Sequence, residues 1–150
     1  MKSNIKKWVE ENKSHITIFL IYEVISFCLI FFHEAWRDEA QSWLLVRDLN
    51  FVELISQMKY EGHFLLWYLI LMPFAKLGFP YITTNIISWI ITSISVWLIV
   101  KYAPFKKYKK YLFIFSWPML YLFPIVSRCY CLIPLAITLI AIFYRDRKTK

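Results

Sequence analysis

The chain has 150 residues, of which 59% are hydrophobic and 20% aromatic, and its mean hydropathy is +0.49. A soluble domain contains about 45–50% apolar residues, so this composition excludes an ordinary soluble protein and predicts a membrane protein. The formal charge is +8, but the basic clusters all flank apolar segments, which argues against a nucleic-acid partner. Only Gly62 and Gly78 are glycines, so a glycine-rich phosphate loop is excluded.

Four apolar segments are long enough, or nearly so, to cross a bilayer as helices, which takes about 20 residues and at least about 17. The chain is therefore expected to be an all-α, polytopic membrane protein with four transmembrane helices. The first segment follows a basic start without a small-residue cleavage site, so it reads as a retained signal anchor. The four predicted spans are residues 16–32, 81–100, 111–127 and 129–144.

A fifth apolar segment, residues 64–75, is too short to span. At 1.5 Å per residue it covers about 18 Å of a hydrocarbon core that is roughly 30 Å thick, and Pro73 interrupts its hydrogen-bond ladder. We expect it to lie on the outer leaflet or to dip into it.

The positions of the basic residues orient the spans. Lysines and arginines cluster before residue 16, in 101–110 and in 145–150. If residues 64–75 do not span, all three clusters face the cytoplasm, as the positive-inside rule favours. The expected arrangement is a single multi-pass domain, residues 1–150, in the cell membrane, with both termini cytoplasmic and residues 33–80 forming a long external loop.

The external loop is acidic and is expected to contain juxtamembrane amphipathic helices. It carries six carboxylates against four basic side chains. Asn50 and Glu53 have capping-box spacing, and residues 38–49 also read as a helix. A single apolar stripe follows the capping box and predicts a helix lying in the membrane interface. Its members are Phe51, Leu54, Ile55 and Met58.

Two adjacent carboxylates, Asp38 and Glu39, follow the first span directly. Neighbouring residues on a helix point about 100° apart, so the two are not expected to cooperate as an acid–base pair, and only one of them faces a site. Asp38 is a candidate general base for a hydroxyl, or a metal ligand. The competing interpretation is a pair of charges favoured by the dipole at a helix N-terminus.

Arg128 lies in the tight external turn between the last two predicted spans. Arginine binds phosphate through two parallel hydrogen bonds and keeps its charge at any working pH. Tyr130 follows close behind and His63 begins the short 64–75 segment, so both are candidates for the same phosphate site. A snorkelling arginine and a structural histidine are the alternatives.

Glu23 lies in the middle of the first span. An intramembrane carboxylate is a candidate functional group by default. Four spans with one such carboxylate resemble the small multidrug-resistance exporters, although those proteins have short loops. The three cysteines carry no such signal, because Cys129 and Cys131 have no further His or Cys at metal-ligand spacing. The residues thus support no cofactor, divalent metal or disulfide.

Taken in order, three motifs resemble the N-terminal part of the GT-C class of membrane glycosyltransferases, most closely the bacterial relatives of the dolichyl-phosphate-mannose protein mannosyltransferases. They read Arg-Asp-Glu-Ala-Gln-Ser-Trp at residues 37–43, Glu-Gly-His-Phe-Leu-Leu-Trp-Tyr at 61–68 and Ser-Arg-Cys-Tyr at 127–130. The resemblance runs from about residue 16 onward. Phe64 departs from it, standing where that family has its first proline, and residues 131–144 contain none of the second carboxylates that some members carry.

The resemblance implies transfer of a sugar from a polyprenyl-phosphate-linked donor at the outer membrane face. Asp38 and Glu39 occupy the catalytic acidic position, with Asp38 as the general base, and Arg128, His63 and Tyr130 lie at the donor phosphate. Members of the class have many more spans, so we expect this chain to be the front part of a larger fold or to work with a partner membrane chain. The alternatives are a four-helix exporter that uses Glu23 and a non-catalytic membrane subunit.

Overall fold

A computed structural model describes residues 2–148 of the chain, and the side chains of residues 12–144. The described part is all-helical, with 75% of residues in helices and no strands, as the sequence predicts. The elements are α1 (Lys2–Ile30), α2 (Arg37–Asp48), α3 (Phe51–Gln57), α4 (Leu65–Lys76), α5 (Thr83–Tyr102), α6 (Lys107–Ile114), the π-helical turn η1 (Pro118–Leu122), the short 3₁₀ helix η2 (Cys129–Cys131) and α7 (Leu132–Lys148).

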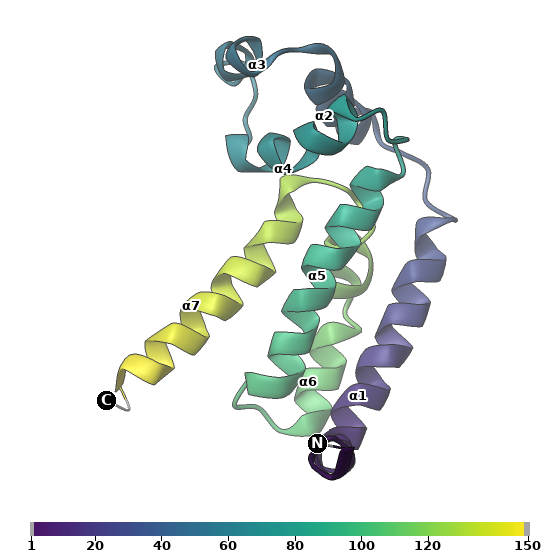
Figure 1. Cartoon of the computed structure of the whole chain (residues 1–150), viewed down its shortest axis with the longest axis vertical. Coiled ribbons are helices and arrows are strands. Elements are labelled where there is room, and N and C mark those ends of the chain that lie inside the picture. The colour runs from purple at the N-terminus through teal and green to yellow at the C-terminus, as the bar shows by residue number, and fades with distance from the viewer. Residues whose placement is uncertain (1, 149–150) are drawn as a thin grey trace.

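Within the residues that the structure describes, two helices are long and apolar enough to cross a membrane. They are the Asn12–Ile30 part of α1, and α5. Figure 1 shows α5 between α1 and α7, and 61% of its apolar window is buried against 17% for α1. The exposed side of α1 carries Leu20, Val24 and Phe27. Helix α5 is therefore the central element of the bundle, while α1 presents an apolar surface outward.

Polar side chains join α1 to α5. The Trp89 indole donates to Ser26 Oγ at 3.0 Å, and Ser93 Oγ donates to a Glu23 carboxylate oxygen at 2.8 Å. Tyr22 extends the tie to η1, because its hydroxyl donates to the Met119 carbonyl at 2.6 Å. Inside an apolar bundle, such bonds satisfy groups that would otherwise be costly to bury.

The expected span 111–127 is not one continuous helix. Helix α6 ends at Ile114, and after a short turn the chain forms the π-helical η1 from Pro118. Proline lacks the N–H that would continue an α-helical ladder, and a second proline, Pro124, follows within the same segment. The next expected span, 129–144, begins as η2 and becomes α-helical only at Leu132, then continues to Lys148.

The segment between α1 and α5 folds into three helices above the bundle. Helix α4 lies across the upper end of α5 (Figure 1), and its Trp67 and Leu71 pack in a core with Trp43 of α2 and Ile87 of α5. Burying large apolar side chains of this kind contributes about 1.5–3 kcal/mol each. Helices α2, α3 and α4 therefore form a packed layer that holds the residues between α1 and α5 in fixed positions.

Helix α3 begins as the sequence predicts. Asn50 Oδ1 accepts from the backbone N–H groups of Val52 and Glu53, both at 3.0 Å, and Glu53 bonds back to the Asn50 N–H at 2.8 Å. This is a complete capping box. The predicted apolar stripe divides, however, because Leu54 is fully buried in the loop core while Phe51 and Ile55 stay about half exposed.

Candidate functional site

The candidate site is centred on Arg128, in the turn that leads into η2. Its guanidinium Nη1 lies 2.7 Å from Asp38 Oδ2 at the start of α2. The Arg128 side chain is 9% exposed and that of Asp38 is 65% exposed, so the pair is open on the carboxylate side only. Residues 90 positions apart in the sequence thus form one ion pair at the outer surface of the bundle.

His63 occupies the other end of the guanidinium. Arg128 Nη2 donates to His63 Nε2. Because a guanidinium only donates, that imidazole nitrogen accepts and carries no proton. The Tyr130 ring completes the cluster, with its centroid 5.8 Å from the guanidinium carbon and 6.2 Å from the His63 ring centroid. Tyr130 remains 38% exposed, so an aromatic face borders the open side.

The turn that carries His63 is itself held by Glu61. The Gln41 side-chain amide donates to one carboxylate oxygen of Glu61 at 2.8 Å, and the Tyr68 hydroxyl donates to the other at 3.1 Å. Burial, followed by the nearby Glu61 charge, raises the pKa of Tyr68 to about 12. Tyr68 therefore stays protonated, and keeps donating to Glu61, through the whole physiological range.

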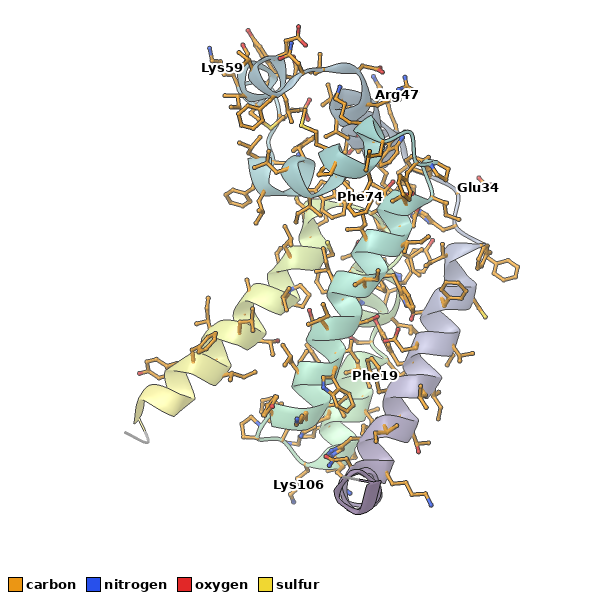
Figure 2. All side chains as sticks on the ribbon, in the orientation of Figure 1. Phe19, Glu34, Arg47, Lys59, Phe74 and Lys106 are labelled. Atoms are coloured by element: carbon orange, nitrogen blue, oxygen red, sulfur yellow. The ribbon has the colours of Figure 1, made fainter. Side chains whose placement is uncertain are left out.

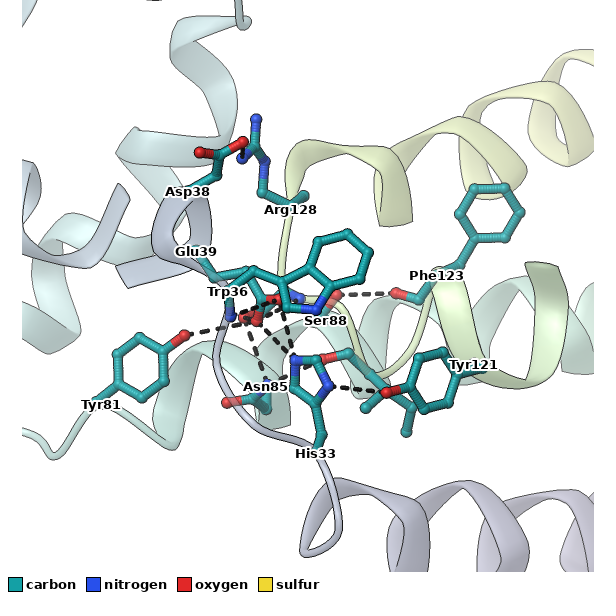
Figure 3. A network of polar contacts seen from close by, with 12 residues as sticks. His33, Trp36, Asp38, Glu39, Tyr81, Asn85, Ser88, Tyr121, Phe123 and Arg128 are labelled. Atoms are coloured by element: carbon teal, nitrogen blue, oxygen red, sulfur yellow. Dashed lines mark hydrogen bonds and ion pairs between the residues drawn. The ribbon is translucent and has the colours of Figure 1, made fainter. Parts of the chain in front are cut away.

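Glu39, the neighbour of Asp38, lies in the interior and is 0% exposed. Figure 3 shows the polar network around it. Ser127 donates to Glu39 Oε2 through Oγ at 2.9 Å and through its backbone N–H at 3.3 Å, and His33 Nε2 lies 3.0 Å from Oε1. The Tyr81 hydroxyl, at 3.5 Å from Oε2, is the most distant of these donors. The carboxylate thus joins the ends of α1, α2 and α5 to the turn that precedes Arg128.

Two backbone N–H groups and a bridging histidine surround the Glu39 carboxyl group. The backbone N–H of Trp36 points to Glu39 Oε1 and that of Ser127 to Oε2, and a backbone N–H can only donate, so both oxygens accept. His33 bridges the network, with Nε2 3.0 Å from Glu39 Oε1 and Nδ1 3.0 Å from the Tyr121 hydroxyl. The buried carboxylate is satisfied on both oxygens by fixed groups.

Helix geometry separates the two neighbouring carboxylates. Asp38 and Glu39 both lie in the first turn of α2, where the helix dipole favours negative charge. Since adjacent side chains diverge by about 100°, Asp38 turns toward Arg128 while Glu39 turns inward and bonds to the N-cap backbone of Trp36.

Of the six residues singled out from the sequence, the structure brings together Asp38, His63, Arg128 and Tyr130 and buries Glu39 next to them. Glu23 lies apart from this cluster, against Ser93 of α5. Sequence reasoning missed the partners of Glu39. His33, Tyr81, Tyr121 and Ser127 lie on four separate segments, and no local pattern joins them. The one available signal was that Ser127 directly precedes Arg128 within the motif already noted.

Within the part of the chain that the structure describes, no group of three or more His, Cys, Asp or Glu side chains is placed to hold a metal ion. Cys129 and Cys131 are free thiols. What the site offers is one bridging guanidinium, one imidazole and one exposed carboxylate. This donor set matches a phosphate anion beside a group that accepts a proton.

Comparison of the chain with protein-family models, with curated proteins and with solved structures gave no match.

Proposed function

We propose that the chain crosses the membrane four times, with both termini in the cytoplasm and the Arg128 cluster at the outer face. The supporting observation is the separation of charges between the two ends of the bundle. The lysines of residues 101–110 lie at one end of α5, and the acidic loop layer lies at the other (Figure 2). In this arrangement α6, η1 and the turn after it together make the third crossing, with their irregular backbone shielded by neighbouring helices.

We propose further that the cluster acts in transfer of a sugar from a polyprenyl-phosphate-linked donor. The observation that carries this is the Arg128 guanidinium held between the exposed Asp38 carboxylate and the His63 imidazole. A phosphate that approaches from the open side replaces one carboxylate contact and gains the planar two-point recognition that arginine gives. The site lies where a lipid-borne phosphate meets water.

The proposed chemistry divides the work between the two ends of the cluster. The acceptor hydroxyl attacks the anomeric carbon of the sugar, and the bond from that carbon to the phosphate oxygen breaks with its electron pair on the leaving polyprenyl phosphate. Arg128, held in place by its bond to His63, stabilises the charge that develops there. Asp38, released from Arg128, takes the hydroxyl proton as general base.

Glu39 takes a different part in this proposal from the catalytic one that its position in the motif implies. Its full burial keeps it from any substrate, and its bonds reach Ser127, the residue directly before Arg128. We assign it as a positioning residue that fixes the start of α2 against the Arg128 turn. The two neighbouring carboxylates thus have different roles: Asp38 acts on the substrate, and Glu39 holds the protein backbone around the site in place.

The second candidate is an exporter that uses Glu23. The observation that favours it is a Glu23 oxygen, Oε1, that is buried without a hydrogen-bond partner, while Oε2 accepts from Ser93. An unsatisfied carboxylate oxygen inside a helix pair is suited to exchange a proton.

Paired substitutions decide between the two. The protein, expressed in its native membrane with any chain that copurifies, is assayed for sugar transfer from polyprenyl-phosphate donors and for drug efflux. The transferase requires that Asp38→Asn abolishes transfer, that Glu23→Gln does not, and that Asp48→Asn, at an exposed carboxylate of the same loop, also retains transfer. Loss of efflux in Glu23→Gln with full efflux in Asp38→Asn establishes the exporter instead. If neither variant changes either activity, both proposals fail and a non-catalytic membrane subunit remains.

A further inference from the structure

A groove lined along α7 from Ile133 to Ile142 leads toward the end of the bundle opposite Arg128. It has a volume of about 970 Å³ and runs between the C-terminal end of α5, helix α6 and the diverging part of α7. Figure 1 shows α7 separating from α5 as it descends toward its C-terminus. The volume falls within the roughly 300–1,000 Å³ of typical small-molecule sites.

The walls of the groove are almost wholly apolar. Ile99 comes from α5, Phe113 from α6 and Ile137 from α7, and Met119 and Phe123 line it deeper in the bundle. Phe113 is 52% exposed and Ile137 is 62% exposed, so the groove opens sideways onto the surface that faces lipid in the proposed membrane placement. A long alkyl chain can enter from the bilayer without crossing a polar barrier.

Two lysines stand at one end of this apolar groove. Lys109 and Lys110 both line it, and Lys110 is 7% exposed. The Lys110 ammonium donates to the Val100 carbonyl at 2.8 Å, which accounts for one of its three protons. Among the side chains that the structure describes, no carboxylate forms an ion pair with either lysine.

A cation in this position favours an anionic neighbour. A buried ammonium with one neutral acceptor is poorly compensated, and a phosphate oxygen would supply both the counter-charge and further hydrogen bonds. Basic pockets between membrane helices on the cytoplasmic side bind anionic lipid headgroups for this reason.

We propose that the groove binds an anionic phospholipid, with an acyl chain along the α6 and α7 walls and the headgroup phosphate on Lys109 and Lys110. The apolar walls select a lipid rather than a free anion, and the lysines select a phosphate with net negative charge rather than a zwitterionic headgroup. The site is separate from the Arg128 cluster and does not depend on sugar transfer.

Native mass spectrometry of the full chain in a neutral detergent tests this site. The probes are phosphatidylglycerol and phosphatidylcholine with identical acyl chains, each titrated and scored for retained lipid. We expect phosphatidylglycerol to bind at least about fivefold more tightly, and Lys109→Gln to reduce that preference by about fivefold, which is the effect of one lysine near a lipid surface. Lys59→Gln, at an exposed lysine of the external loop, is the matched control and leaves binding unchanged.

A second variant tests the apolar walls without touching a charge. Ala141→Trp places a large side chain in the groove and is expected to weaken retention of both lipids. Equal binding of the two lipids, equal effects of Lys109→Gln and Lys59→Gln, or unaltered retention in Ala141→Trp overturns the proposal. A lipid-free dimer that phosphatidylglycerol leaves intact also overturns it, since a second copy of the chain would then fill the groove.

Discussion

Glu39→Gln, compared with Asp38→Asn, is the most direct test of the buried network. Both substitutions replace a carboxylate by an amide of nearly the same shape, at adjacent positions of one helix turn. The Asp38 side chain is 65% exposed and makes one ion pair with Arg128, whereas Glu39 is fully buried among donors from four segments. Any difference between the two variants therefore reports the surroundings and not the chemistry of the change.

The expected loss in the free energy of unfolding is several times larger for Glu39→Gln than for Asp38→Asn. In Glu39→Gln the new NH₂ group faces a backbone N–H whichever way it is turned, because Trp36 N–H approaches one oxygen and Ser127 N–H the other. An unpaired buried donor costs about 1–3 kcal/mol, and loss of the charge weakens each remaining bond. We expect a loss of about 3 kcal/mol in the free energy of unfolding, against about 0–1 kcal/mol for Asp38→Asn, whose ion pair is exposed on one side.

The assay is thermal or denaturant unfolding in detergent micelles, followed by tryptophan fluorescence, with both variants in the same detergent. A double-mutant cycle with His33→Gln isolates the Glu39–His33 term, because residues in one hydrogen-bond network are not additive. Equal destabilisation by Glu39→Gln and Asp38→Asn, or a zero coupling energy in the cycle, would refute the reasoning.

Three further predictions concern the surrounding contacts. Arg128→Lys removes the simultaneous contact of one guanidinium with Asp38 and His63. Binding of polyprenyl phosphate, measured by titration in nanodiscs, should weaken roughly tenfold, which corresponds to the loss of one charge-assisted hydrogen bond of about 1.5 kcal/mol. An unchanged affinity would mean that the phosphate binds elsewhere. Asn50→Ala removes the side-chain cap of α3 and should cost about 1 kcal/mol, measured by chemical unfolding, whereas Asn50→Asp should restore most of it. Because the pKa of Tyr68 is raised to about 12, the stability that its protonated hydroxyl gives the folded state is complete below about pH 10 and is lost as pH rises through about 12. The difference in melting temperature between the unmodified protein and Tyr68→Phe should therefore shrink between those two pH values. A constant difference would contradict this prediction.

Local features of the fold could be predicted from the sequence because their causes are local. The capping box at Asn50 depends on residues three apart, and the apolar runs of α1 and α5 meet a length criterion that needs no tertiary information. The break within residues 111–127 was not predicted, although Pro118 and Pro124 are visible in the sequence. The average hydropathy of residues 111–127 is that of a membrane span. Hydropathy does not report whether the backbone hydrogen bonds of a helix can continue past a proline.

The candidate site could be predicted from the sequence only in part, because some of its contacts are made between distant segments. The order of three motifs was enough to select Asp38, His63, Arg128 and Tyr130, which the fold brings together. The fate of Glu39 could not be read from the sequence, because its burial depends on donors that lie up to 88 residues away. From the amino-acid sequence alone, a buried carboxylate with such distant partners looks the same as a solvent-exposed carboxylate on a helix.

The long reach of the Glu39 network also sets an order of assembly. Its strongest side-chain donor, Ser127, follows it by 88 positions, and at about 5–20 residues per second the ribosome needs on the order of ten seconds to make the intervening chain. Until then Glu39 has only the partners made earlier, namely His33, the Trp36 backbone and Tyr81. The layer of α2, α3 and α4 therefore gains its full set of bonds to the bundle only after the turn carrying Arg128 has been made, so the last residues to arrive at the site are the ones that complete it.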